Sequence, residues 1–273
     1  MRLLIATGGA PHSDLAVRVG AQIAERTRSN STILVVIKRE EDRSRMAAIL
    51  SRAQQLLGKE TSESQIKVRV GHPAEQIIRE AEENNYDLVI LGEKPSHDLV
   101  TRFMGSTVER VVEHAPCPVL VAKGKIGPLR RFLLCDSGVA EPTLLSRFMV
   151  RLAKLIEDKV DVTVLHVMSQ MSAGPGVRGE QLRASAEELM QKHAPEGELL
   201  EQDIQTLKQL NLQPRPKVRH GLVVDEILAE AQSGDYDLVI IGAHQGKGWQ
   251  RFLLDDLAHQ IIVQADRPVL VVR

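Results

Sequence analysis

The chain has 273 residues, a length that predicts two domains. It contains 35 Lys and Arg residues and 36 Asp and Glu residues, which give a formal net charge of −1. This balance argues against the broad basic surface of a nucleic-acid-binding protein. Its seven Phe, Tyr and Trp residues leave little for base stacking, and no apolar run approaches the roughly 18 residues of a membrane-spanning helix. The apolar stretch at the start is too short for a signal peptide. We therefore expect a soluble, cytoplasmic globular protein without nucleic-acid or membrane partners.

The first half of the chain alternates short apolar segments with longer amphipathic ones. The short segments are rich in β-branched residues, and continuous apolar runs of this kind are typical of strands covered on both faces. We expect strands at residues 3–7, 32–37, 66–70, 88–91 and 119–122.

The amphipathic segments between these strands have helical spacing. Ser13-Asp14 is expected to open the first helix, whose apolar face includes Leu15, Val19 and Ile23. Further helices are expected at 46–57, 73–84 and 106–114. Strands that alternate with helices indicate parallel βαβ units with right-handed crossovers. The first half is thus predicted to be a doubly wound α/β domain with a five-stranded parallel sheet.

The second half repeats this organisation. Residues 86–92 recur as 236–242, and residues 118–121 recur as 268–271, both at an offset of 150. A repeat of this length is a domain duplication and not a solenoid. We expect two tandem domains of Rossmann-like type, residues 1–126 and 127–273, with a short turn-rich linker at 123–128.

Ligands of open parallel sheets bind outside the carboxyl ends of the strands, where the strand order reverses. In the first half, the fourth strand ends at Gly92, and Gly105-Ser106-Thr107 then opens a helix. Glycine permits close approach of a phosphate, and a helix N-terminus offers unpaired N–H groups. Ser106 to Glu109 also forms the pattern of a capping box, which is the purely structural interpretation.

The pattern of the whole chain resembles the universal stress protein family in its tandem form. Nucleotide-binding members of this family carry a glycine, two residues, a second glycine, nine residues and then Gly-Ser or Gly-Thr, with an aspartate after the first strand. The resemblance implies a stress-response regulatory protein that binds ATP or another adenine nucleotide. The nucleotide-binding residues that it implies are Thr7, Gly8, Gly92, Gly105, Ser106 and Thr107.

The first half departs from the family pattern at two positions. Pro95 stands at the place of the second glycine, where it removes a backbone donor, and Gly8 stands at the place of the aspartate. We expect an adenine-nucleotide site that is weakened but present.

The second half departs further. It keeps Gly242 and has an acid, Asp136, after its first strand, but Gln245 replaces the second glycine and Asp255-Asp256 replace Gly-Ser. Two carboxylates repel a phosphate at close range, and these two are expected to cap a helix N-terminus. We predict a degenerate site that does not bind ATP.

Two other function classes are open. One is an interaction module of the same fold that binds no nucleotide and acts through an unknown protein partner. The other, an ATP-using enzyme, is disfavoured because no general base, nucleophile or metal-ligand spacing is evident, so that slow incidental ATP hydrolysis is the most we expect. Cys117 and Cys135 are expected to be packed side chains, and neither a metal nor a catalytic residue is assigned.

Two segments bear on assembly. The helical stretch 180–210, interrupted at Pro195-Glu196-Gly197, is expected to cover the second sheet, with a protein-docking face as the alternative. The last strand of each half is a sheet edge that seeks a partner. The resemblance implies that the two edges pair antiparallel within the chain, as an intrachain pseudo-dimer, and leaves a further homodimer open.

Overall fold

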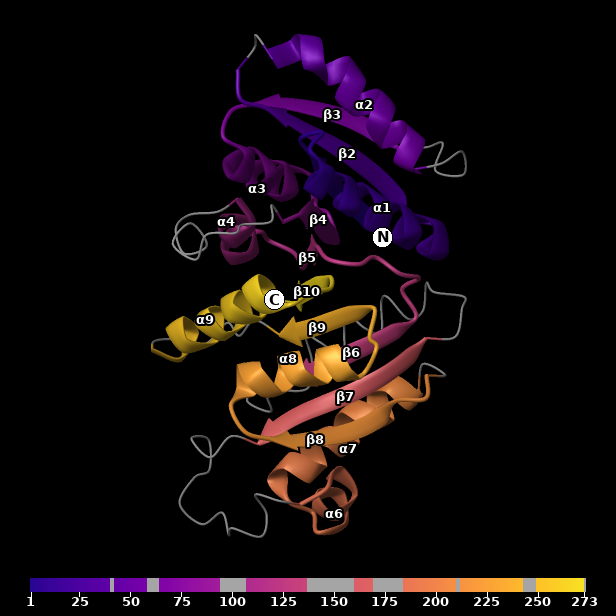
Figure 1. Ribbon diagram of the computed structural model, residues 1–273, viewed down its shortest axis with the longest axis vertical. Coiled ribbons are helices and arrows are strands. Elements are labelled where there is room, and N and C mark those ends of the chain that lie inside the picture. The colour runs from indigo at the N-terminus through magenta and orange to yellow at the C-terminus, as the bar shows by residue number, and fades with distance from the viewer. Residues whose placement is uncertain are drawn as a thin grey trace. The chain divides into compact units, whose positions relative to one another are not determined.

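The computed structural model describes residues 1–39, 42–57, 64–93, 107–136, 160–168, 184–209, 212–242 and 249–272. The chain forms two compact units (Figure 1). The first comprises residues 1–128 and 266–271, and the second comprises residues 129–265 and 272–273.

The first unit is built on the predicted parallel sheet. Its strands are β1 (Arg2–Thr7), β2 (Asn30–Ile37), β3 (Gln65–Val70), β4 (Leu88–Gly92) and β5 (Val119–Ala122). They lie in the order β3-β2-β1-β4-β5 and are parallel throughout. The order reverses between β1 and β4, as the doubly wound prediction requires.

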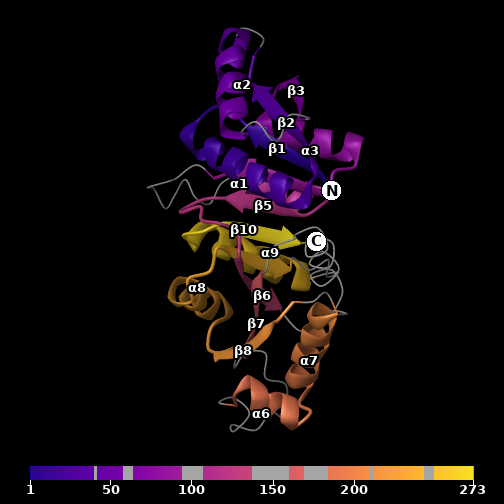
Figure 2. The same cartoon turned by 90° about the vertical axis from the view of Figure 1, so that its right-hand side faces the viewer.

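Helices cover both faces of this sheet. They are α1 (Pro11–Thr27), α2 (Arg43–Leu57), α3 (Pro73–Asn84) and α4 (Thr107–His114). Figure 2 shows α1 and α2 on one side of the strands and α3 on the other. Because both faces are covered, the apolar runs of β1, β2 and β4 are buried along nearly their whole length, as predicted.

The start of α1 differs from the sequence prediction. The helix begins at Pro11, with Ala10 as an N-cap residue that makes no side-chain hydrogen bond, so Ser13-Asp14 does not open it. Proline has the fixed φ that suits a first helical position and lacks the N–H that would be unpaired there. Ser13 and Asp14 are consequently buried in the first turn.

The second unit repeats the strand order. Its strands β6 (Arg131–Asp136), β7 (Asp161–Met168), β8 (Arg215–His220) and β9 (Leu238–Gly242) lie in the order β9-β6-β7-β8 and are parallel. Helix α8 (Val223–Ser233) corresponds to α3 of the first unit, and α9 (Trp249–Gln264) precedes the last strand.

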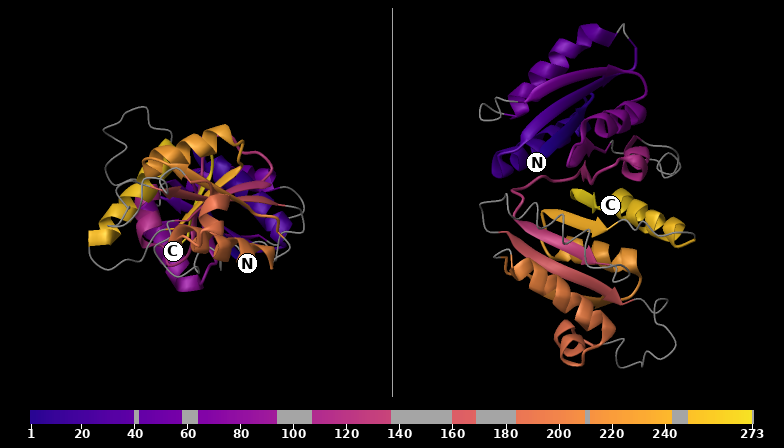
Figure 3. Two further views of the ribbon diagram at one scale, coloured as in Figure 1. Left: turned by 90° about the horizontal axis from the view of Figure 1, so that it is seen from below. Right: turned by 180° about the vertical axis from the view of Figure 1, so that it is seen from behind.

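The structure describes residues 184–209 of the predicted helical stretch 180–210, and these residues form two helices. They are α6 (Ala186–Gln191) and α7 (Pro195–Lys208), and both contact β8 (Figure 3). The interruption lies before Pro195 and not at 195–197, since His193 has a left-handed φ of 50° and Pro195 then begins α7. The expectation that this stretch covers the sheet is confirmed.

Residues 269–271 of strand β10 (Val269–Val272) belong to the first unit. The strand pairs antiparallel with β5, with Leu270 opposite Leu120 and Val271 opposite Val119. The antiparallel pairing expected for the two last strands is therefore present, and all four residues of β5 are buried.

A buried carboxylate joins the β3 edge of the first unit to α3. Glu80 is 1% exposed, and its Oε1 accepts hydrogen bonds from Lys67 Nζ at 2.6 Å and Tyr86 OH at 3.0 Å. Its Oε2 accepts one from Arg69 Nε at 2.7 Å. A buried charge is stable only when it is paired and hydrogen-bonded in this way.

The same network recurs in the second unit at an offset of 150. Glu230 is fully buried and accepts from Lys217 Nζ at 2.8 Å, from Tyr236 OH at 2.8 Å and from Arg219 Nη1 at 3.1 Å. The tyrosine of the repeated motif is thus a structural residue that satisfies a buried acid.

Gly92 allows α1 to approach the end of β4 closely. A Cβ atom at this position would lie 1.9 Å from the carbonyl oxygen of His12 and 3.0 Å from the Cα of Ser13. These are backbone atoms of a helix and cannot turn aside. The space beside the Cα of Gly92 is therefore occupied by the backbone of α1.

This contact predicts a stability effect at position 92. Gly92→Ala forces β4 and α1 apart, and we expect it to lower the free energy of unfolding by about 1–3 kcal/mol in urea denaturation. Gly8→Ala is the matched control, because a Cβ there meets no atom within 4 Å. Equal stability of the two variants would contradict the packing.

The buried glutamates predict acid sensitivity. Burial by itself raises the pKa of Glu80, but hydrogen bonds from Lys67, Arg69 and Tyr86 outweigh it and hold that pKa below its ordinary value. The pKa of Glu230 is lowered in the same manner. Each carboxylate then contributes its full stabilisation above the unfolded-state pKa of about 4.3, and loses it as the pH falls through the folded-state pKa.

Urea midpoints measured across this pH range test the effect. Wild-type stability should fall more steeply below pH about 4.3 than that of Glu80→Gln, which has no such carboxylate to protonate. Glu82→Gln changes an exposed acid of the same helix and should keep the wild-type slope. A Glu80→Gln slope equal to that of wild type would disprove the assignment.

Candidate functional site

The fold brings two of the predicted loops to one edge of the first sheet. Thr7 is the last residue of β1 and Gly92 is the last residue of β4, and these neighbouring strands are parallel. The strand order reverses here, which is where ligands of open α/β sheets bind.

The loop between β1 and α1 is held together by hydrogen bonds that involve the side chains of Thr7 and Ser13. The amide of Gly8 donates to Ser13 Oγ at 3.3 Å, and the amide of Gly9 donates to Thr7 Oγ1 at 3.2 Å. The Thr7 hydroxyl donates to Ser13 Oγ at 3.1 Å, and that of Ser13 donates to the carbonyl oxygen of Ala10 at 2.8 Å. A phosphate at these amides would have to displace existing hydrogen bonds.

Gly8 and Gly9 differ in their surroundings. Gly8 is exposed, and a side chain there would enter open space. Gly9 has a φ of +74°, and a Cβ there would lie 2.6 Å from Cγ1 of Ile49 in α2. The absence of a side chain at Gly9 therefore lets α2 lie close to the loop. Next to Gly8, in contrast, there is open space.

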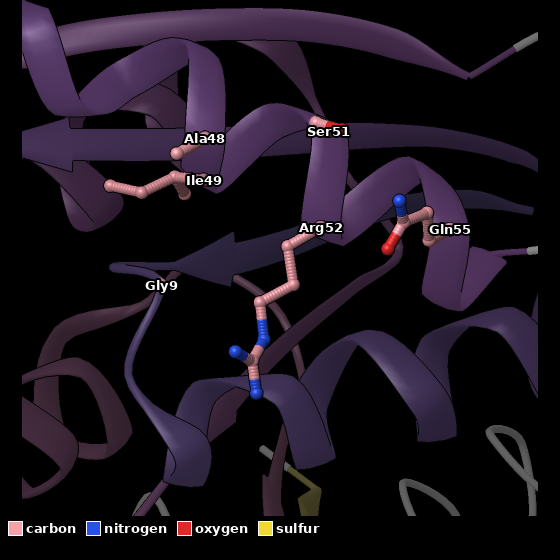
Figure 4. Close-up of a pocket in the computed structure, with 6 residues that line it drawn as sticks. All are labelled: Gly9, Ala48, Ile49, Ser51, Arg52 and Gln55. Atoms are coloured by element: carbon pink, nitrogen blue, oxygen red, sulfur yellow. The ribbon is translucent and has the colours of Figure 1, made fainter.

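A pocket of about 450 Å³ lies between this loop and α2 (Figure 4). It is lined by Gly9, Ala48, Ile49, Ser51, Arg52 and Gln55. The lining residues of α2 recur at helical spacing on one face, and none of them is acidic. Small-molecule sites have volumes of this order.

Arg52 is the charged residue of the pocket. Its side chain reaches from α2 towards α1, where its Nε donates to Asp14 Oδ2 at 2.7 Å and its Nη2 lies 2.5 Å from the same oxygen. The Asp14 side chain is 10% exposed and that of Arg52 is 56% exposed. In this ion pair the carboxylate of Asp14 is therefore nearly buried, and the guanidinium of Arg52 faces solvent.

The remaining predicted residues of the first half are only partly described. Thr107 is the first residue of α4 and is half-buried. Gly105, Ser106 and Pro95 lie outside the described residues.

In the second half, Asp136 ends β6 and Gly242 ends β9, at the places corresponding to the ends of β1 and β4. The prediction that Asp255-Asp256 cap a helix N-terminus is wrong. Helix α9 begins at Trp249, and the two acids lie within the helix. The apolar residues that continue from Trp249 to Leu257 extend the helix towards its N-terminus. Gln245 lies outside the described residues.

Two sequence expectations concern metal ligands and the two cysteines. Among them, no three His, Cys, Asp or Glu side chains are placed to hold a metal ion. Cys117 and Cys135 are both buried, and burial raises the pKa of Cys117 to about 12. A thiol with this pKa is protonated at neutral pH, which fits a packed side chain and not a nucleophile.

Sequence reasoning missed Arg52 and the pocket-lining face of α2. A signal was present, since residues 43–57 contain three arginines and no acid. The pairing of Arg52 with Asp14 depends on the contact between α1 and α2, which no local sequence pattern predicts.

Within the described ranges, no helix is both long and apolar enough to cross a bilayer.

Comparisons with known proteins agree with this architecture. A sequence model described as the universal stress protein family matches residues 1–123 and again residues 128–273. A universal stress protein of Methanocaldococcus jannaschii is 42% identical over 53 residues, which are 19% of this chain and 31% of that relative. The chain thus spans about a third of the curated relative's length.

Solved structures extend the likeness to the whole chain. The crystal structure of a universal stress protein from Archaeoglobus fulgidus has a TM-score of 0.67 at 16% identity, and the match covers 99% of this chain and 95% of that one. Another from the same organism, in complex with dAMP, has a TM-score of 0.37 at 18% identity and covers 53% of this chain and 98% of its own. A similarity as low as the second carries no information about what this chain binds.

Proposed function

Because the chain belongs to the universal stress protein family, we propose that it is a stress-response regulatory protein whose first domain binds an adenine nucleotide such as ATP. In this proposal the domains are residues 1–126 and 127–273, and the second domain binds no nucleotide. The observation that carries the proposal is the pocket beside Gly9, at the edge of the sheet where the strand order reverses.

Three properties of this pocket suit a nucleotide. Its volume is within the range of small-molecule sites, it lies at the carboxyl end of β1, and its charged residue is an arginine. The open space beside Gly8 leaves room for a ligand between the pocket and the end of β4. From there, the 5′-phosphates would extend to the start of α4, whose first residue Thr107 follows Gly105 and Ser106 in the sequence.

The same structure accounts for a weak site. The amides of Gly8 and Gly9 are already hydrogen-bonded to Ser13 and Thr7, so they contribute to a phosphate only at the expense of those bonds. The aspartate that the family places at position 8 is absent, which removes an acceptor for the ribose. Pro95 removes a further backbone donor.

The proposal for the second domain rests on charge. Asp255 and Asp256 occupy the places of Gly-Ser in the family pattern, and two adjacent carboxylates oppose a triphosphate. Asp136 and Gly242 alone supply no phosphate donor apart from a backbone amide. We therefore expect one nucleotide per chain at most.

A second candidate function is an interaction module that binds no nucleotide. The observation in its favour is the closed loop 7–13, whose glycine amides are satisfied without a ligand. Such a module would act through a protein partner, as an intrachain pseudo-dimer or a further homodimer. In either case we assign the protein no enzymatic role and a cytoplasmic location.

Equilibrium binding of a fluorescent ATP analogue separates the two candidates. Gly105→Asp places a carboxylate where the phosphates are proposed to lie, and we expect it to weaken binding at least tenfold, since close charges of like sign repel. Gln205→Asp adds the same charge to an exposed position of α7 and should bind as wild type does.

Two results would contradict the nucleotide proposal. If wild type gives no saturable signal, or if Gly105→Asp binds as well as wild type, the interaction module is the better account. A second binding event in wild type that is lost when Asp255 is replaced would contradict the assignment of the second domain.

A further inference from the structure

Asp14 binds one edge of the Arg52 guanidinium. Its Nε and Nη2 are both directed at Asp14 Oδ2, while its Nη1 has no hydrogen-bond partner among the residues that the structure describes. A guanidinium has five N–H donors in a fixed fork, so one edge is available for an acceptor in the pocket.

The pocket holds one charged side chain, the guanidinium of Arg52, which is paired with Asp14. Asp14 is nearly buried and lies behind the guanidinium, which is more than half exposed. The remaining lining residues are neutral, and Ser51 and Gln55 add polar side chains. Lys38 and Arg39, which follow β2 at the same edge of the sheet, are exposed and basic as well.

The strand order decides which part of a nucleotide reaches Arg52. Strand β1 lies between β2 and β4, so α2, which follows β2, and α4, which follows β4, lie on opposite sides of β1. A nucleotide with its 5′-phosphates at the start of α4 therefore directs its nucleoside towards α2. An anionic group beside Arg52 must then be carried by the ribose.

In nucleotide-binding α/β folds, an acid near the ribose accepts its hydroxyl groups, and an arginine there accommodates a ribose phosphate. This chain has open space at Gly8 and an arginine fixed beside Gly9. Building on the proposed function, we infer that the first domain selects adenine nucleotides with a phosphate monoester on the 2′ or 3′ oxygen of the ribose. Arg52 binds that phosphate, and Asp14 is the positioning residue.

Competition against the fluorescent ATP analogue tests the selection. The competitors are 5′-AMP, ADP, adenosine 2′,5′-bisphosphate and adenosine 3′,5′-bisphosphate, and ADP controls for the charge of a second phosphate. We expect one of the bisphosphates to bind roughly tenfold more tightly than 5′-AMP and ADP, since it gains a charge-assisted hydrogen bond. The tighter of the two identifies the oxygen that carries the phosphate.

Variants assign the effect to Arg52. Arg52→Gln should remove the tenfold preference for a bisphosphate over 5′-AMP and ADP, and Arg52→Lys should restore part of it because the charge returns without the fork. Asp14→Asn should reduce the preference, since the guanidinium is no longer held. Arg18→Gln replaces an exposed arginine of α1 outside the pocket and should keep the wild-type preference.

The outcomes are distinguishable. If 5′-AMP and ADP bind but neither bisphosphate is preferred, the inference fails and the proposed function stands. If the preference persists in Arg52→Gln, Arg52 is not the phosphate-binding residue. If wild type binds no adenylate, both the inference and the proposed function fail.

Discussion

The nucleotide site proposed for the first domain depends on the contact between the first turn of α1 and Gly92. Because Gly92 has no side chain, the carbonyl of His12 lies against the end of β4, and the loop 7–13 is held over the edge of the sheet. This placement turns the loop towards α2 and leaves the pocket beside Gly9. Gly92 therefore has a packing role, and its role in nucleotide binding stays a prediction.

The residues that recur between the two halves of the sequence include a set that stabilises the fold. Glu80 with Lys67, Arg69 and Tyr86 recurs as Glu230 with Lys217, Arg219 and Tyr236, and each carboxylate is buried and fully hydrogen-bonded. A buried acid that lost one of these partners would be strongly destabilising, so the set is kept as a unit. The residues that differ between the halves, at the loops, are those on which the functional proposals depend.

Strand positions and the doubly wound order could be predicted because buried parallel strands are continuous apolar runs. The helix starts at Pro11 and Trp249 could not, because Ser13-Asp14 and Asp255-Asp256 have the composition of N-caps while the helices extend beyond them. Of the candidate site, sequence predicted the edge of the sheet through Thr7, Gly8 and Gly92. It did not predict Arg52, since that residue acquires its role through a contact with Asp14, 38 positions away.

A crystal structure of the chain with a bound adenine nucleotide tests the central claim most directly. We predict density for one nucleotide per chain, with its ribose in the pocket lined by Gly9 and Arg52 and its 5′-phosphates at the start of α4. A nucleotide beside Asp255 and Asp256, or one bound while the pocket beside Gly9 stays empty, would contradict the account.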